Sequence, residues 1–92
     1  MELLDDLAIT SALEHLAWQR RGDALVKVTK LADFAAALAW VNRLGELAEA
    51  RNHHPDIAIS WNTVTLTLTT HSAGGLTEAD IELAAAIDAL EG

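Results

Sequence analysis

The sequence predicts an α+β fold of two layers: a four-stranded antiparallel sheet with helices packed on one face, in the order α-β-β-α-β-β-α. Three observations predict it. Residues 64–69 alternate strictly between apolar side chains and threonine, the pattern of a half-buried strand, and residues 26–29 alternate in a similar way. Over residues 34–48, apolar side chains recur every three or four positions, which is typical of an amphipathic helix.

The first part of the chain is expected to form a short helix and a hairpin. Ser11 and Glu14 have the spacing of a capping box, in which each side chain satisfies a backbone N–H at a helix start. Gly22-Asp23 predicts the turn of the hairpin, and the alternating run 26–29 predicts its second strand.

A long helix should follow, with Asp33 as its N-cap and its end at about Asn52. Its apolar residues make an arc wider than the covering of one sheet requires. Either the helix is deeply buried, or Trp40 and its neighbours meet another subunit. The arc consists of two stripes: Phe34, Leu38, Val41, Gly45 and Ala48 in one, and Ala37, Trp40, Leu44 and Leu47 in the other.

The second hairpin is expected from residues 57–61 and 64–69, which both alternate and are joined by a turn at Asn62-Thr63. A glycine-containing loop then leads to the last helix. Thr77 and Asp80 have capping-box spacing and predict where that helix begins.

Composition limits the classes of partner. The chain has 92 residues, which suits one domain over 1–92, and a formal charge of −8 with only six Lys and Arg, so nucleic acid is not an expected partner. No cysteine is present for a disulfide framework or a zinc ribbon. Neither a signal peptide nor an apolar run of membrane-spanning length is visible. We therefore expect a cytoplasmic protein without a membrane partner.

The junction between the long helix and the second hairpin holds the most reactive side chains. Two adjacent histidines, His53 and His54, precede Pro55, the only proline, which forces the residue before it out of the helical conformation. Glu49 lies about one turn earlier on the helix. Imidazole is the side chain best suited to give and take protons near neutral pH. This corner is therefore a candidate proton-transfer site.

Each of these residues also has a purely structural interpretation. A histidine at a helix end often caps the last carbonyl groups, and Asp80 is explained by helix capping alone. His71 at a strand end is a candidate surface residue, and so is His15 in the first helix. Zinc is not expected, because adjacent histidines do not place two rings on one helical face. The residue types alone favour an acid–base site only modestly over a structural domain.

The spacing of the polar residues resembles the signature of the pterin-4a-carbinolamine dehydratase family. The resemblance extends over nearly the full length, including Gly74-Gly75-Leu76-Thr77 and Asp33-Phe34. One position departs from the family: Ile57 stands where many members have an aromatic residue, which bears on how completely the pterin ring is walled. The matching positions are Glu49, His53, His54, Pro55, Trp61, His71 and Asp80.

The resemblance implies a hydro-lyase that dehydrates 4a-hydroxytetrahydropterin (4a-hydroxytetrahydrobiopterin) to quinonoid dihydropterin, without a metal or an organic cofactor. It implies that His53, His54 and His71 are catalytic, with His54 and His71 as the main acid–base pair and His53 contacting the pterin and assisting. Glu49 and Asp80 would orient the imidazoles or hold the pyrimidine edge of the pterin. Pro55 and Trp61 would also lie at the substrate, Trp61 as a wall or core residue.

The resemblance also bears on partners. It implies a homodimer or homotetramer and a link to an aromatic amino acid hydroxylase, which produces the 4a-hydroxypterin. The family also includes a dimerisation partner of a transcription factor and relatives linked to assembly of a carbon-fixing enzyme. A non-catalytic interaction or assembly protein, using helix surfaces instead of the pocket, is therefore the alternative function.

Overall fold

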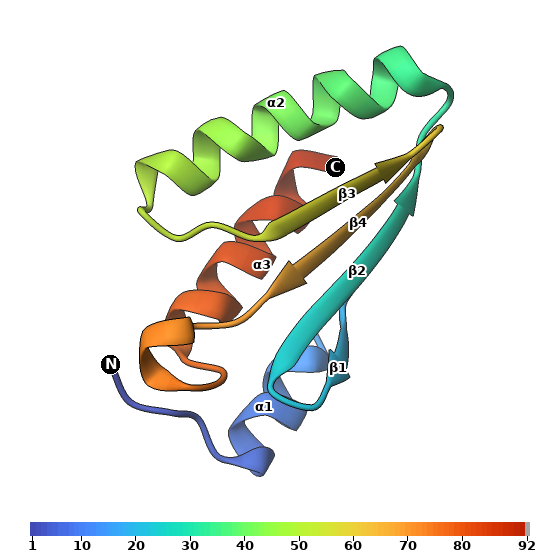
Figure 1. The fold of residues 1–92 in the computed structure, drawn as a ribbon. Coiled ribbons are helices and arrows are strands. Elements are labelled where there is room, and N and C mark those ends of the chain that lie inside the picture. Colours follow the sequence, from blue (N-terminus) through green and yellow to red (C-terminus); the bar gives the residue numbers. More distant parts are fainter. Residues whose placement is uncertain (92) are drawn as a thin grey trace.

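The computed structural model describes residues 1–91 and has the two-layer α+β architecture expected from the sequence (Figure 1). Its sheet has the order β1-β2-β4-β3, and every neighbouring pair is antiparallel. No helix in the described part of the chain is long and apolar enough to cross a membrane. The elements are α1 (Asp6–Leu13), β1 (Gln19–Arg21), β2 (Ala24–Lys30), α2 (Phe34–Ala50), β3 (Asp56–Ser60), β4 (Thr63–Leu68), the 3-10 turn η1 (His71–Ala73) and α3 (Glu78–Glu91).

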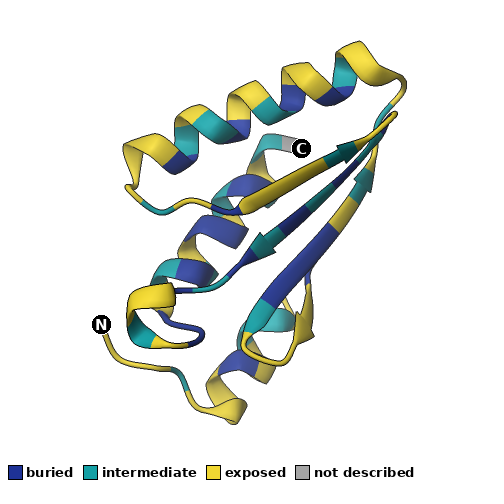
Figure 2. Cartoon of the chain, viewed as in Figure 1, coloured by how far each residue is buried: buried dark blue, intermediate teal, exposed yellow. Residues whose placement is uncertain are grey.

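The hydrophobic core lies between the sheet and the helices. The inward residues of β4 alternate with half-buried threonines, as the sequence pattern predicts. In Figure 2 the buried positions of α2 and α3 turn toward the central strands, whereas the outer side of α2 is largely exposed. The core consists of Ile9, Trp18, Leu25, Ala37, Trp40, Leu44, Ala48, Val64, Leu66, Leu68, Leu76, Leu83, Ala84 and Ile87.

Strand β2 turns the opposite face inward from the one that its apolar residues suggest. Lys27 pairs with Leu66 across the β2–β4 ladder, so it shares the helix-covered face with the buried leucine. Val26 and Val28 therefore lie on the other face, where Val26 is buried at 8% exposure and Val28 is 61% exposed. The alternation located the strand correctly, but a period of two does not say which face is buried.

A carboxylate on α3 accounts for the buried lysine. Asp88 Oδ1 accepts Lys27 Nζ at 2.7 Å and Trp18 Nε1 at 2.9 Å, while its Oδ2 accepts the backbone N–H of Ala17 at 2.8 Å. The Lys27 side chain is only 5% exposed. A buried charge requires a partner and hydrogen bonds, and Asp88 supplies them to Lys27. Through Ala17 and Trp18 the same carboxylate joins the segment between α1 and β1 to the last helix.

The first helix begins earlier than its sequence suggested. Asp5 is the N-cap, and its Oδ1 accepts a backbone N–H of the first turn at 2.8 Å. Ser11 lies inside α1 and Glu14 follows it, so the capping box expected at these residues is wrong. The backbone N–H of Leu4 bonds to the carbonyl of Leu76 at 2.9 Å, and this long-range contact fixes where the chain enters the helix.

The broad apolar arc of α2 is divided between the core and the surface. Trp40 is only 4% exposed and belongs to the core, so deep burial explains it and a subunit contact is not required. Phe34 and Leu38, from the other stripe, remain 45% and 41% exposed. The sequence thus marked both apolar stripes, but only the tertiary packing decides which of them is buried.

Candidate active site

The corner between α2 and β3 is built by a helix-termination motif. Asn52 has a left-handed backbone, with φ of 49°. Its N–H bonds to the carbonyl of Glu49, and the N–H of His53 bonds to the carbonyl of Ala48, both at 3.1 Å. These two bonds form a Schellman motif, which satisfies carbonyl groups that the helix end would leave free. The motif fixes the backbone of His53 directly, and the buried Pro55 then leads the chain into β3.

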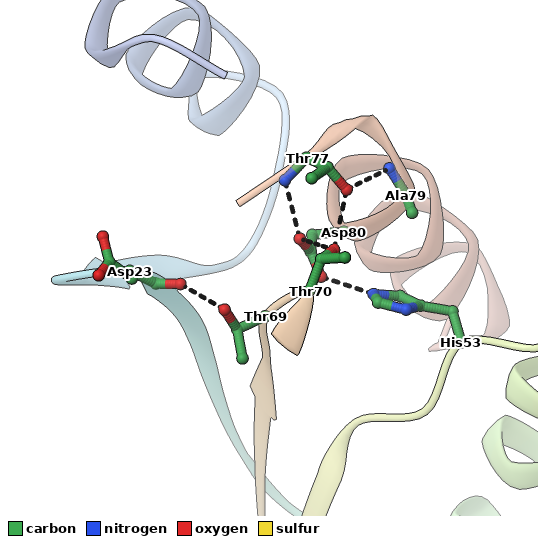
Figure 3. Close-up of polar contacts among 7 residues, drawn as sticks. All are labelled: Asp23, His53, Thr69, Thr70, Thr77, Ala79 and Asp80. Atoms are coloured by element: carbon green, nitrogen blue, oxygen red, sulfur yellow. Dashed lines mark hydrogen bonds and ion pairs between the residues drawn. The ribbon is translucent and has the colours of Figure 1, made fainter. Parts of the chain in front are cut away.

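His53 contacts a buried carboxylate that lies 27 residues later in the chain. Its Nε2 lies 2.6 Å from Oδ1 of Asp80 on the first turn of α3 (Figure 3). The Asp80 side chain is fully buried, and that of His53 is 17% exposed. Asp80 also caps α3, because its Oδ2 accepts the backbone N–H of Thr77 at 2.9 Å, which is one half of the expected capping box; the Thr77 hydroxyl accepts the N–H of Ala79 instead of that of Asp80. One carboxylate therefore both starts the helix and orients the imidazole.

His54 has a carboxylate partner of its own. Its Nε2 lies 2.7 Å from Oε2 of Glu49, which is on the last turns of α2. The two side chains are 55% and 81% exposed, so solvent weakens this pair compared with the buried one. The two adjacent imidazoles thus sit in different surroundings, one held in the protein interior and the other at the surface.

His71 approaches the corner from another segment. It opens the 3-10 turn η1 that follows β4, and this turn closes on Thr70, whose carbonyl accepts the N–H groups of Ala73 and Gly74 at 3.0 Å. Gly74 supplies the left-handed residue, with φ of 79°, that the end of the turn requires. His71 is exposed. The β4–α3 connection therefore presents a third imidazole toward the α2–β3 corner.

The three histidines line one pocket of about 270 Å³. The structure thus brings together three side chains that the sequence predicted to share a site. Among the described residues, no set of three or more His, Cys, Asp and Glu side chains is placed to hold a metal ion. The pocket brings together side chains that give, take and hold protons. Its lining consists of Asn52, His53, His54, Thr69, Thr70, His71 and Ser72.

Trp61 is not gathered with these residues. It lies in the turn between β3 and β4, at the other end of β3 from the histidines, and is 67% exposed. Its φ of 55° is rare for a large side chain. Asn62 holds this turn by donating its amide to the carbonyl of Leu31 at 2.9 Å. The structure assigns Trp61 a place in a turn, outside the pocket.

Two threonines stand behind the site: Thr77, which the sequence predicted as a helix cap, and Thr70, for which it predicted no role. Thr70 is buried, and its hydroxyl bonds to Asp80 Oδ2 and to the Thr77 hydroxyl, each at 2.8 Å. In the sequence Thr70 continues a run of strand threonines, and the pair Thr70-His71 belongs to the family resemblance without a role for the hydroxyl. Only the contact with α3 reveals its position in the network.

Comparison with known proteins gives consistent matches over the whole chain. Residues 2–90 match the family described as pterin 4 alpha carbinolamine dehydratase. A relative in Thermomicrobium roseum is 54% identical over 85 residues, covering 91% of each chain, and one in Nocardia farcinica is 53% identical over 90 residues, covering 97% of this chain and 95% of the relative. Both relatives are named, provisionally, as pterin-4-alpha-carbinolamine dehydratases.

Two solved structures share the fold. A transcriptional coactivator/pterin dehydratase from Brucella melitensis superposes with a TM-score of 0.93 at 33% identity, over 99% of this chain and 100% of that one. A pterin dehydratase-like protein identified as a RuBisCO assembly factor in the alpha-carboxysome has a TM-score of 0.66 at 29% identity, over 84% of this chain and 89% of that one. The chain therefore belongs to the pterin-4a-carbinolamine dehydratase family.

Proposed function

We propose that this protein dehydrates 4a-hydroxytetrahydropterin to quinonoid dihydropterin and water, using side-chain acid–base chemistry. The observation that carries the proposal is one pocket lined by His53, His54 and His71, two of which are paired with carboxylates. Family membership and the names of the relatives support the same substrate class. The substrate would come from an aromatic amino acid hydroxylase, which releases the pterin in the hydroxylated form.

The reaction requires two proton transfers. An acid must protonate the hydroxyl on carbon 4a so that it leaves as water, and a base must remove the proton from N5 so that the C4a=N5 double bond forms. The lone pair of N5 pushes out the leaving group, so the substrate supplies the electrons. Imidazoles perform both transfers near neutral pH, and each contributes about 10²- to 10⁴-fold to the rate.

The surroundings of the histidines favour a division of roles. His53 is the best-oriented base, because a buried carboxylate holds one ring nitrogen and leaves the other for the substrate. His54 and His71, which the sequence suggested as the main pair, are more exposed than His53. We assign the protonation of the departing hydroxyl to one of these two histidines. Glu49 orients His54 in the way that Asp80 orients His53.

Stopped-flow absorbance of 4a-hydroxytetrahydropterin, generated in situ, tests this function. The wild-type protein should accelerate the decay, and His53→Ala should remove about 10²- to 10⁴-fold of that acceleration. His15→Ala is the matched control, since His15 is exposed and lies just after α1, outside the pocket. Decay no faster than in buffer would refute the dehydratase function and favour an interaction or assembly role.

We further propose that copies of this chain associate through the outer face of α2. A groove of about 640 Å³ runs beside Val41, Gly45 and Ile57, and the exposed Phe34 and Leu38 extend its apolar surface. A Cβ added at Gly45 would stand in open space, so the fold of a single chain does not require glycine at this position. Sedimentation should give a dimer or tetramer mass, and a single-chain mass at all concentrations would contradict association.

A further inference from the structure

The hydrogen bonds behind Asp80 run in one direction. The backbone N–H of Ala79 donates to Thr77 Oγ1 at 3.3 Å, and Thr70 donates its hydroxyl to Asp80 Oδ2 at 2.8 Å. Each hydroxyl has a single hydrogen, and that of Thr70 is committed to the carboxylate. The 2.8 Å contact between the two hydroxyls must therefore be donated by Thr77 (Figure 3). The result is a relay from the helix backbone through two hydroxyls to the carboxylate.

Asp80, held in place by this relay, determines which nitrogen of His53 carries the proton. Asp80 Oδ2 already accepts two donors, the Thr70 hydroxyl and the Thr77 N–H. Its Oδ1 faces His53 Nε2 at 2.6 Å, where an ionised carboxylate needs a donor. Nε2 therefore carries hydrogen, and Nδ1 of the neutral ring keeps its lone pair. In Figure 3 that second nitrogen lies away from Asp80.

We propose that Thr70 and Thr77 are positioning residues that, through Asp80, hold His53 as the tautomer protonated on Nε2, with Nδ1 free to accept the substrate proton. This proposal rests on the proposed dehydratase function for its kinetic consequence. Thr70, Thr77 and Asp80 are all buried, at 8%, 0% and 0% exposure, so water does not substitute for a lost donor. The hydroxyls thus act on the reaction through another residue.

Thr70 also connects two of the histidines. Its side chain reaches Asp80 and hence His53, while its backbone forms a bridge with Gly75 that closes the loop carrying His71. The N–H of Thr70 bonds to the Gly75 carbonyl at 3.0 Å. A change that removes only the hydroxyl leaves these backbone bonds in place. Such a variant distinguishes the effect of the hydroxyl on Asp80 from any effect on the loop that carries His71.

The test compares Thr70→Val, which keeps the shape and loses the hydroxyl, with Thr70→Ser, which keeps the hydroxyl. The ring ¹⁵N chemical shifts of His53, measured without pterin, report which nitrogen is protonated. Stopped-flow kinetics on the same proteins separate kcat from KM. Thr65→Val is the matched control, because Thr65 is a half-buried threonine on the open face of β4, the strand that precedes Thr70.

Wild type should show His53 protonated on Nε2. Thr70→Val removes one of the two donors that hold Asp80 Oδ2, so the carboxylate should turn away from His53 in part of the molecules. The two tautomers should then mix, and kcat should fall by about ten- to a hundredfold, the factor expected for a lost hydrogen bond to a charged group, with KM little changed. Thr70→Ser should restore both readings, and Thr65→Val should match wild type. A tautomer in Thr70→Val identical to that of wild type would overturn the proposal.

Two further outcomes are decisive. If Thr70→Val does not fold, the wild-type spectrum still decides, because a proton on Nδ1 of His53 is incompatible with the relay. If wild type has no dehydratase activity, the proposed function fails, while a tautomer change in Thr70→Val would still show that the relay orients His53.

Discussion

Replacing Asp80 by asparagine should lower the rate of pterin dehydration by about 10²- to 10⁴-fold and leave the fold intact. The reason is geometric. The Thr77 N–H can only donate, so the asparagine must turn its oxygen toward Thr77. Its amide NH₂ then faces His53 Nε2, which is forced to accept. The ring proton moves to Nδ1, and the lone pair intended for the substrate is lost.

The same inversion of tautomer accounts for the loss of activity when the aspartate of a Ser-His-Asp triad becomes asparagine. Stopped-flow rates and ¹⁵N shifts of His53 should therefore change together in Asp80→Asn. Asp56→Asn is the control, because Asp56 is an exposed aspartate at the start of β3, next to the same corner. Full turnover in Asp80→Asn would show that His53 is not the base.

Replacing Asp88 by alanine should be the most destabilising single change considered, at about 3 kcal/mol. It removes the carboxylate that pairs with the buried Lys27 ammonium, and it also deprives Trp18 Nε1 and the Ala17 N–H of their acceptor. For a domain of this size the loss corresponds to a melting temperature lower by about 12 °C or more. Calorimetry measures it directly.

A surface ion pair provides the comparison. Arg20 and Asp6 lie 2.9 Å apart, but the Asp6 side chain is 89% exposed, so Asp6→Ala should change the melting temperature very little. Asp88→Asn, which keeps the shape and one acceptor, should fall between the two. Equal melting temperatures for Asp88→Ala and Asp6→Ala would mean that the buried contact adds nothing to stability.

Lys27 also shows why sequence pattern predicted the strands better than their faces. The alternation in β2 places Val26 and Val28 on one face of the strand and Lys27 and Thr29 on the other. Hydrophobicity alone would turn the face with the valines toward the helices. The lysine is inside because Asp88, 61 positions later, supplies its counter-charge. No local pattern contains that information. The start of α1 was misplaced for a related reason, since its position depends on contacts with residues near 76.

The candidate site was predictable to the extent that its contacts are local. Glu49 and His54 are five residues apart across a helix end, and the sequence indicated their proximity. The contact between His53 and Asp80 spans 27 residues, and the family resemblance suggested only that Asp80 orients an imidazole or holds the pterin. Thr70 was missed, because its hydroxyl acquires a role only when β4 and α3 are brought together.

Strand β3 lies between the histidine corner and the turn that carries Trp61. The histidine corner precedes β3, whereas Trp61 follows it, exposed and outside the pocket. Because the chain has no cysteine, a cysteine in place of Trp61 would be its only thiol. A fluorophore or a surface linker attached there would lie a full strand away from the histidines. The molecule thus offers a natural point of immobilisation that leaves its reactive end facing solution.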